Sequence, residues 1–102
     1  MEGTLRKRIM AILEENEEPL TVDDIITRLG LRPYHKRLVY GSLSHIAKSI
    51  RRSGGILMMR APYCLNCGYV FTDLKRIRKP SRCPRCKSER IAPPTFMIKR
   101  RG

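Results

Sequence analysis

Apolar side chains in the first third of the chain recur at helical spacing. The first group, at steps of four, three and one, is Leu5, Ile9, Ile12 and Leu13. This stripe predicts an amphipathic helix over about residues 4–17, which Pro19 ends. A second stripe, Val22, Ile25, Ile26 and Leu29, predicts a helix that Thr21 caps and Gly30 ends.

A third apolar stripe, Val39, Leu43, Ile46 and Ile50, predicts a helix over residues 33–53, begun by Pro33 and closed by Gly54-Gly55. Two short apolar runs follow on either side of a cysteine-rich segment, at Ile56–Arg60 and Thr95–Lys99. Both runs are typical of strands, and we expect them to pair antiparallel as the two sides of a wing.

This order of elements predicts an α+β fold, namely a winged helix-turn-helix of three helices and a two-stranded wing. The residues between the two strands would then be an insertion at the tip of the wing. We therefore expect one domain over residues 1–62, completed by a returning strand at 93–102, and a ribbon over residues 63–92.

The four cysteines of the inserted segment follow the pattern Cys64-x2-Cys67-x15-Cys83-x2-Cys86. Two Cys-x-x-Cys pairs at this separation suit tetrahedral coordination of one metal ion by four thiolates. Each pair would wrap one side of the ion, while the segment between the pairs supplies the strands of the ribbon. Two disulfides are the alternative, which an intracellular chain disfavours. No position suggests an open ligand site, so we expect a structural and not a catalytic metal.

The cysteine knuckles, Cys64-Leu65-Asn66-Cys67-Gly68-Tyr69 and Cys83-Pro84-Arg85-Cys86, resemble those of rubredoxins, which hold iron. Lys87 departs from this resemblance, because rubredoxins usually have glycine after the final cysteine. The chain also has no tryptophan, and residues 63–102 have a net charge of +9, unlike the acidic body of an electron carrier. We therefore expect one Zn²⁺ per chain in place of iron.

Charge is distributed unevenly along the chain. The whole sequence has a net charge of +13, whereas residues 1–31 have −3, and no acidic residue occurs between Ile25 and Thr72. This asymmetry indicates a polyanionic partner that contacts the second and third parts of the chain. A solvated basic surface on a ribosome-associated or thermophilic protein is the alternative interpretation.

The third predicted helix has a polar stripe opposite its apolar one, at Tyr34, Arg37, Gly41, Ser44, Lys48 and Arg51. Small residues at the centre of such a stripe let a helix approach base edges in a major groove, while cations contact phosphates. Gly41 costs a helix interior about 1 kcal/mol, and close packing of another helix is the alternative reason for it. We expect bases to be faced by Tyr34, Arg37, Gly41 and Ser44, and phosphates to be contacted by Lys36, Lys48, Arg51 and Arg52.

Taken together, the run from Lys36 to Arg52 and the two cysteine knuckles resemble a group of small archaeal predicted transcriptional regulators. These proteins combine a winged helix-turn-helix with a rubredoxin-like zinc ribbon, and the resemblance covers essentially the whole chain. It implies a winged-helix fold and a role in transcription.

The function predicted from these patterns is a cytoplasmic, DNA-binding transcriptional regulator without enzymatic activity. It would bind double-stranded DNA through the helix over residues 33–53, with the zinc ribbon as a structural and accessory contact module. An RNA- or ribosome-associated zinc-ribbon protein and a protein-interaction adaptor of the transcription machinery remain alternatives. Uninterrupted apolar runs such as Ile56–Met59 are far shorter than the roughly 20 residues that span a bilayer. Glutamates directly follow the apolar run at residues 9–13, so a secretion signal is not expected.

Overall fold

Three α-helices occupy the first half of the chain in a computed structural model that describes residues 2–100. They are α1 (Glu2–Glu15), α2 (Val22–Leu29) and α3 (Lys36–Ser49). The predicted helix over 33–53 is therefore α3 with a 3₁₀ turn at each end, at Pro33–His35 and Ile50–Ser53. No helix within residues 2–100 has the length and apolar character needed to cross a membrane.

The start and end of α2 follow directly from its sequence. The Thr21 hydroxyl accepts a hydrogen bond from the Asp24 amide, and the Asp24 carboxylate accepts one from the Thr21 amide, each at 3.0 Å. This reciprocal cap satisfies two backbone groups that the first turn of a helix leaves free. Gly30 ends the helix with a φ of 68°, a conformation that glycine adopts at little cost. The predicted cap and stop are thus confirmed.

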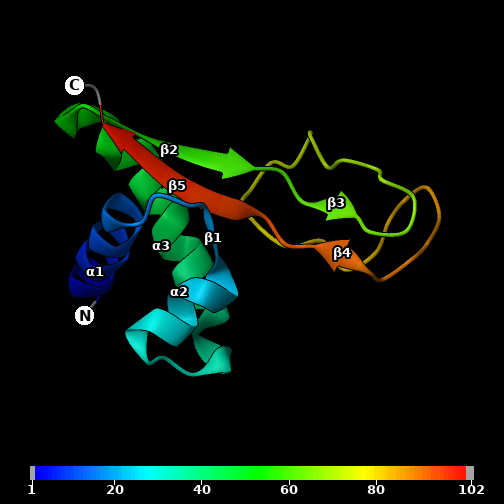
Figure 1. Ribbon diagram of the computed structural model, residues 1–102, viewed down its shortest axis with the longest axis horizontal. Helices are drawn as coiled ribbons and strands as arrows, with labels where there is room; N and C mark the ends of the chain where they lie inside the picture. The colour runs from blue at the N-terminus through cyan, green and yellow to red at the C-terminus, as the bar shows by residue number, and fades with distance from the viewer. Residues whose placement is uncertain (1, 101–102) are drawn as a thin grey trace.

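A three-stranded antiparallel sheet packs against the helices, in the order β1 (Leu20–Thr21), β5 (Thr95–Arg100) and β2 (Gly55–Arg60) (Figure 1). Strands β2 and β5 pair along their whole length, from Gly55 opposite Arg100 to Arg60 opposite Thr95. The predicted pairing of the two apolar runs is confirmed. The short strand β1 was not expected, because two residues give no periodic signal.

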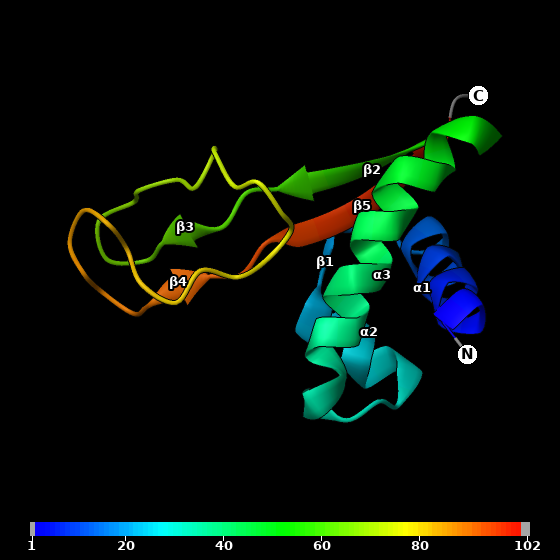
Figure 2. The same cartoon turned by 180° about the vertical axis from the view of Figure 1, so that it is seen from behind.

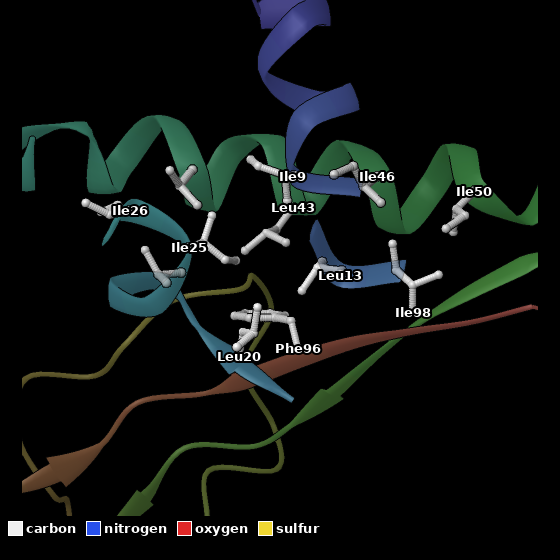
Figure 3. Close-up of a cluster of buried hydrophobic side chains, with 12 residues drawn as sticks. Ile9, Leu13, Leu20, Ile25, Ile26, Leu43, Ile46, Ile50, Phe96 and Ile98 are labelled. Carbon is white, nitrogen blue, oxygen red and sulfur yellow. The ribbon is translucent and has the colours of Figure 1, made fainter. Parts of the chain in front are cut away.

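The core lies between the helices and the inner face of the sheet. Each predicted apolar stripe contributes to it: Ile9 and Leu13 from α1, Ile25 from α2 and Leu43 from α3 are all at most 1% exposed. Figure 3 shows Phe96 and Ile98 of β5 pointing towards these side chains. The last strand of the chain therefore completes the core of its first half.

The residues between β2 and β5 extend away from the helices as a ribbon (Figure 1). Its paired strands are β3 (Tyr63–Cys64) and β4 (Ile91–Ala92), where the chain enters and leaves the ribbon. The expectation that the segment between the cysteine pairs forms the strands is wrong, since it contains only an isolated bridge between Tyr63 and Val70. That segment is used for turns and for a long loop.

This loop, which includes residues 74–79, returns from the ribbon towards the helices, as both views show (Figures 1 and 2). Ile77 in the loop is half-buried and packs against the helical core. The contact ties the ribbon to the helical domain beside β2, whose Met59 lines the same cleft as Ile77.

We predict that Ile77→Ala weakens this tie. Removing a half-buried isoleucine side chain should lower the free energy of unfolding by about 1–2 kcal/mol, measured by denaturant titration in the presence of zinc. Leu65→Ala is the matched control, because Leu65 is 52% exposed on the first cysteine knuckle. Equal stability of the two variants would show that the loop is not held by Ile77.

Candidate metal centre and nucleic-acid interface

The four cysteine sulfur atoms converge at one point in the ribbon. All four Sγ atoms lie within 4.8 Å of one another. The Sγ atoms of Cys64 and Cys86 are 3.5 Å apart, and those of Cys67 and Cys83 are 3.6 Å apart. A tetrahedron with Zn–S bonds of about 2.3 Å has edges of about 3.8 Å, so these sulfur atoms fit a single Zn²⁺.

Two similar knuckles hold the sulfur atoms in place. In the first, the Cys67 amide donates to Cys64 Sγ at 3.4 Å, and the Gly68 amide donates to the Cys64 carbonyl at 2.9 Å. In the second, the Cys86 amide donates to Cys83 Sγ at 3.5 Å, and the Lys87 amide to the Cys83 carbonyl at 2.9 Å. Backbone donors of this kind stabilise negative charge on thiolate sulfur.

The knuckles differ in the residue that follows the second cysteine of each pair. Gly68 has a φ of 82° and Lys87 a φ of 67°, both in the left-handed region. Glycine adopts this conformation at little cost. Lys87, the departure from the rubredoxin pattern, takes a conformation that costs a residue with a Cβ atom about 1–2 kcal/mol.

Asn66 supports the metal centre in a way that sequence reasoning missed. Its side-chain amide donates to Cys86 Sγ at 3.4 Å, across the two knuckles. This hydrogen bond is the main reason that the pKa of Cys86 falls to about 6. The only sign of this contact in the sequence is that Asn66 lies between Cys64 and Cys67.

The pKa values of the thiols show why a cation suits the site. A hydrogen bond from the Tyr69 backbone lowers the pKa of Cys67, but burial and the neighbouring thiols outweigh it and raise the pKa to about 11. Four thiolates at these separations repel one another, so they cannot all ionise readily by themselves. A central dication removes that repulsion, and the donor set of four sulfur atoms is one that Zn²⁺ prefers.

The polar face of α3 is the second candidate site. Tyr34, in the 3₁₀ turn before α3, is 78% exposed, and the cations Arg37, Lys48, Arg51 and Arg52 are also exposed. Ser44 is half-buried. A Cβ atom added to Gly41 would meet nothing within 4 Å. No other helix therefore packs against Gly41 in the described part of the chain, and that alternative reason for the glycine is wrong.

Lys36 differs from the other cations proposed for phosphate contact. Its Nζ atom forms an ion pair with Asp23 of α2 at 3.1 Å, although both side chains remain largely exposed. Arg51 and Arg52 both lie in the 3₁₀ turn after α3. Of the predicted phosphate contacts in the described part of the chain, Lys36 is therefore the one that an acidic side chain partly neutralises.

Residues 74–79, which we call the ribbon loop, lie along α3. A first cleft is lined by Lys48 and Arg51 of the helical segment and by Lys75 and Arg76 of the loop. A second cleft is lined by Arg37 together with Arg76, Arg78 and Lys79. The loop thus runs antiparallel to α3, and Ser44, Arg76 and Ile77 line both clefts. The sequence did not predict this position of the loop, because the place of residues 74–79 in the chain gives no indication that they lie beside α3.

A helical domain joined to a four-cysteine metal ribbon defines a zinc-ribbon protein. Residues 4–58 match the family model described as "PF0610-like, N-terminal", and residues 62–101 match the "PF0610 rubredoxin-like zinc beta-ribbon domain". The chain belongs to the PF0610-like family. Its four cysteines form the zinc site of that ribbon, as the sequence predicted.

A solved structure of similar fold supports this assignment. The solution NMR structure of protein PF0610 from Pyrococcus furiosus is 32% identical in sequence, with a TM-score of 0.81. The match covers 97% of this chain and 91% of that one. A comparison with curated proteins gives no match.

We predict one zinc ion per chain by elemental analysis. Apparent binding free energies of structural Zn²⁺ are about 10–16 kcal/mol, so chelation should unfold residues 63–92. Circular dichroism should retain most of the helical signal, because the core around α1–α3, which Phe96 and Ile98 of β5 complete, contains none of the four cysteines. Absence of metal, or a disulfide between any two of the four cysteines in protein isolated from cells, would contradict the assignment.

We also predict that Lys87→Gly strengthens the ribbon. Glycine relieves the positive φ at this position and should raise the stability of the zinc-bound ribbon by about 1 kcal/mol. Lys87→Ala is the matched control, since it also loses the bond from Lys87 Nζ to the Pro84 carbonyl but keeps the Cβ atom. Competition with a chromogenic chelator measures how well each variant retains zinc. Equal zinc retention by the two variants would exclude backbone strain at Lys87 as a factor in the stability of the ribbon.

Proposed function

We propose that this protein binds duplex DNA as a transcriptional regulator without enzymatic activity. In this proposal, residues 1–62 and 93–102 form a winged helix-turn-helix, and the ribbon at 63–92 is inserted at the tip of the wing. The arrangement of α2, a short turn and α3, followed by the antiparallel pair β2 and β5, supports this proposal. In Figure 2, α3 lies in front of the sheet.

The observation that carries the proposal is the open space at Gly41. It lies at the centre of an exposed stripe that has cations on both sides of it, Arg37 towards the start and Lys48 towards the end of α3. A helix that enters a major groove needs a close backbone approach in its middle and positive charge at the flanking phosphates. If no partner approached this face of the helix closely, a glycine in the helix interior would only lower its stability.

Duplex RNA fits this face less well than duplex DNA. The major groove of A-form RNA is deep and narrow, and an α-helix does not enter it. A role on RNA or the ribosome would therefore use the basic surface without the Gly41 region.

The second candidate function is an adaptor of the transcription machinery. Ile56 and Met58 are 43% and 45% exposed on β2. With Met97 opposite Met58, they form a small apolar area on the outer face of the sheet. A protein partner would cover such an area, and DNA would not.

We predict that Gly41→Leu abolishes specific duplex binding while the fold is retained, because the added bulk lies in open space. Gly41→Ala is the matched control: it should stabilise α3 by about 1 kcal/mol and reduce affinity far less than leucine does. Fluorescence anisotropy with duplex DNA and duplex RNA measures binding, and thermal melting and zinc content verify the fold. Full duplex binding by folded Gly41→Leu would move the contact surface off α3.

Single cations on α3 should separate base recognition from phosphate contact. Arg37→Ala, if Arg37 contacts a guanine, should cost roughly 1–3 kcal/mol and relax the preference at one base pair. Lys48→Ala should weaken binding to all sequences alike and reduce the salt dependence by about one unit. Binding to a randomised duplex library at several salt concentrations distinguishes the two effects.

A further inference from the structure

The clefts on either side of the ribbon loop concentrate positive charge without compensation. Seven cationic side chains line them: Arg37, Lys48, Arg51, Lys75, Arg76, Arg78 and Lys79. No acidic side chain lines either cleft. The nearest acidic residue in sequence, Asp73, lines a neighbouring hollow together with Lys75, Arg76 and Arg78 but forms no ion pair with them. Among residues 2–100, the ion pairs are Lys36 with Asp23 and Arg100 with Glu14, so none of the seven takes part in one.

Like charges repel, so a basic loop beside a basic helix is unfavourable unless something holds them together. Here Ile77, in the middle of the loop, packs against the helical core and fixes the loop beside α3. The fold therefore keeps two rows of cations side by side. Such an arrangement is stabilised by a polyanion that contacts both rows.

The dimensions of B-form DNA restrict where the loop can meet a duplex. An α-helix with its side chains is about 10–12 Å across, and the major groove is about 12 Å wide. With α3 in the groove, no room remains beside it for a second chain segment. A loop fixed against the side of α3 must then lie over the edge of the groove, where the sugar–phosphate backbone runs.

We propose that the ribbon loop binds the phosphates on one side of the groove that α3 enters. This proposal rests on the duplex binding proposed above and names the part of the ribbon that takes part in it. Lys75 and Arg76 would contact phosphates near the end of α3, and Arg78 and Lys79 would contact them near its start. The zinc ribbon is thereby a backbone clamp, and its contacts carry no sequence preference of their own.

The clamp is one-sided. The opposite side of the α3 stripe is bounded by Arg6 of α1 and by Leu38 and His45 of α3 itself. Among the residues that line the hollow on that side, Arg6 is the one lysine or arginine that does not belong to α3. Protection of the DNA backbone should therefore extend further on the side of the ribbon than on the other.

The test compares two double variants with the wild-type zinc protein. Lys75→Ala with Arg76→Ala removes two charges from the ribbon loop, and Lys7→Ala with Lys99→Ala removes two exposed charges from α1 and β5. Binding to a duplex of about 20 base pairs, roughly two helical turns, is measured across a range of salt concentrations. Hydroxyl-radical footprinting then maps the protected backbone, and zinc content and melting confirm the fold of each variant.

Each phosphate contact contributes about −0.9 to the slope of log K against log[salt]. The loop variant should reduce the steepness of that slope by about two units, lose the ribbon-side protection and keep its sequence preference. The α1 and β5 variant should change the slope by less than one unit and keep the footprint.

Equal slopes and footprints for the two double variants would overturn the loop proposal while leaving DNA binding by α3 intact. Binding lost in the loop variant but retained by Gly41→Leu would also overturn it, since the loop would then act without α3 in the groove. If the wild-type protein binds no duplex at any salt concentration, the proposed function itself is wrong and the loop proposal falls with it.

Discussion

The position of β5 is the constraint on which the rest of the molecule depends. This strand follows the ribbon in the sequence, pairs with both β1 and β2, and supplies Phe96 and Ile98 to the helical core. The chain therefore cannot complete the helical domain until residues 61–94 have closed into a loop. Closing a flexible loop of this length costs about 3 kcal/mol. Zinc shortens the effective loop, because the pairing of β3 with β4 beside the metal brings its two ends together. The metal thus supports a core that it does not contact.

The charge asymmetry of the sequence corresponds to a division of roles in the structure. The acidic residues near the start of the chain act within the fold: Asp24 caps α2, Asp23 pairs with Lys36, and Glu14 pairs with Arg100 of β5. The cations that these acidic residues neutralise, Lys36 and Arg100, lie outside the centre of the exposed face of α3. The cations of α3 and of the ribbon loop are left with no acidic neighbour in their clefts. Seven of the 22 lysine and arginine side chains of the chain are therefore concentrated where a polyanion would gain most from them.

Features that repeat over short distances were predictable from the sequence, and features that depend on a single distant contact were not. The apolar stripes at Ile9, Ile25 and Leu43 predicted the helices and the core, because helical spacing exposes one face of each to its neighbours. The cysteine spacing predicted the zinc site, since each knuckle is built within a few residues. Ile77 gave no such signal: it lies alone in a run of cations, and only the tertiary fold shows that it is held against the core. The bond from Asn66 was missed as well, because a contact with the opposite knuckle leaves no periodic pattern. Lys87 was noted only as a departure from the rubredoxin pattern, and its positive φ was not predicted.

The small core of the ribbon explains why a metal is used there. Its buried residues are Cys64, Phe71, Cys83 and Ile91, of which only Phe71 and Ile91 are not zinc ligands. A segment this short cannot bury enough apolar surface to fold alone, so a metal supplies the missing stability. The surface is then free to carry eight basic and two acidic residues over positions 63–92. A larger apolar core would need more of those positions, and the cations of the ribbon loop occupy them. Metal coordination and phosphate binding are in this view parts of one arrangement, because the zinc lets a segment that is mostly cationic surface hold a fixed shape beside α3.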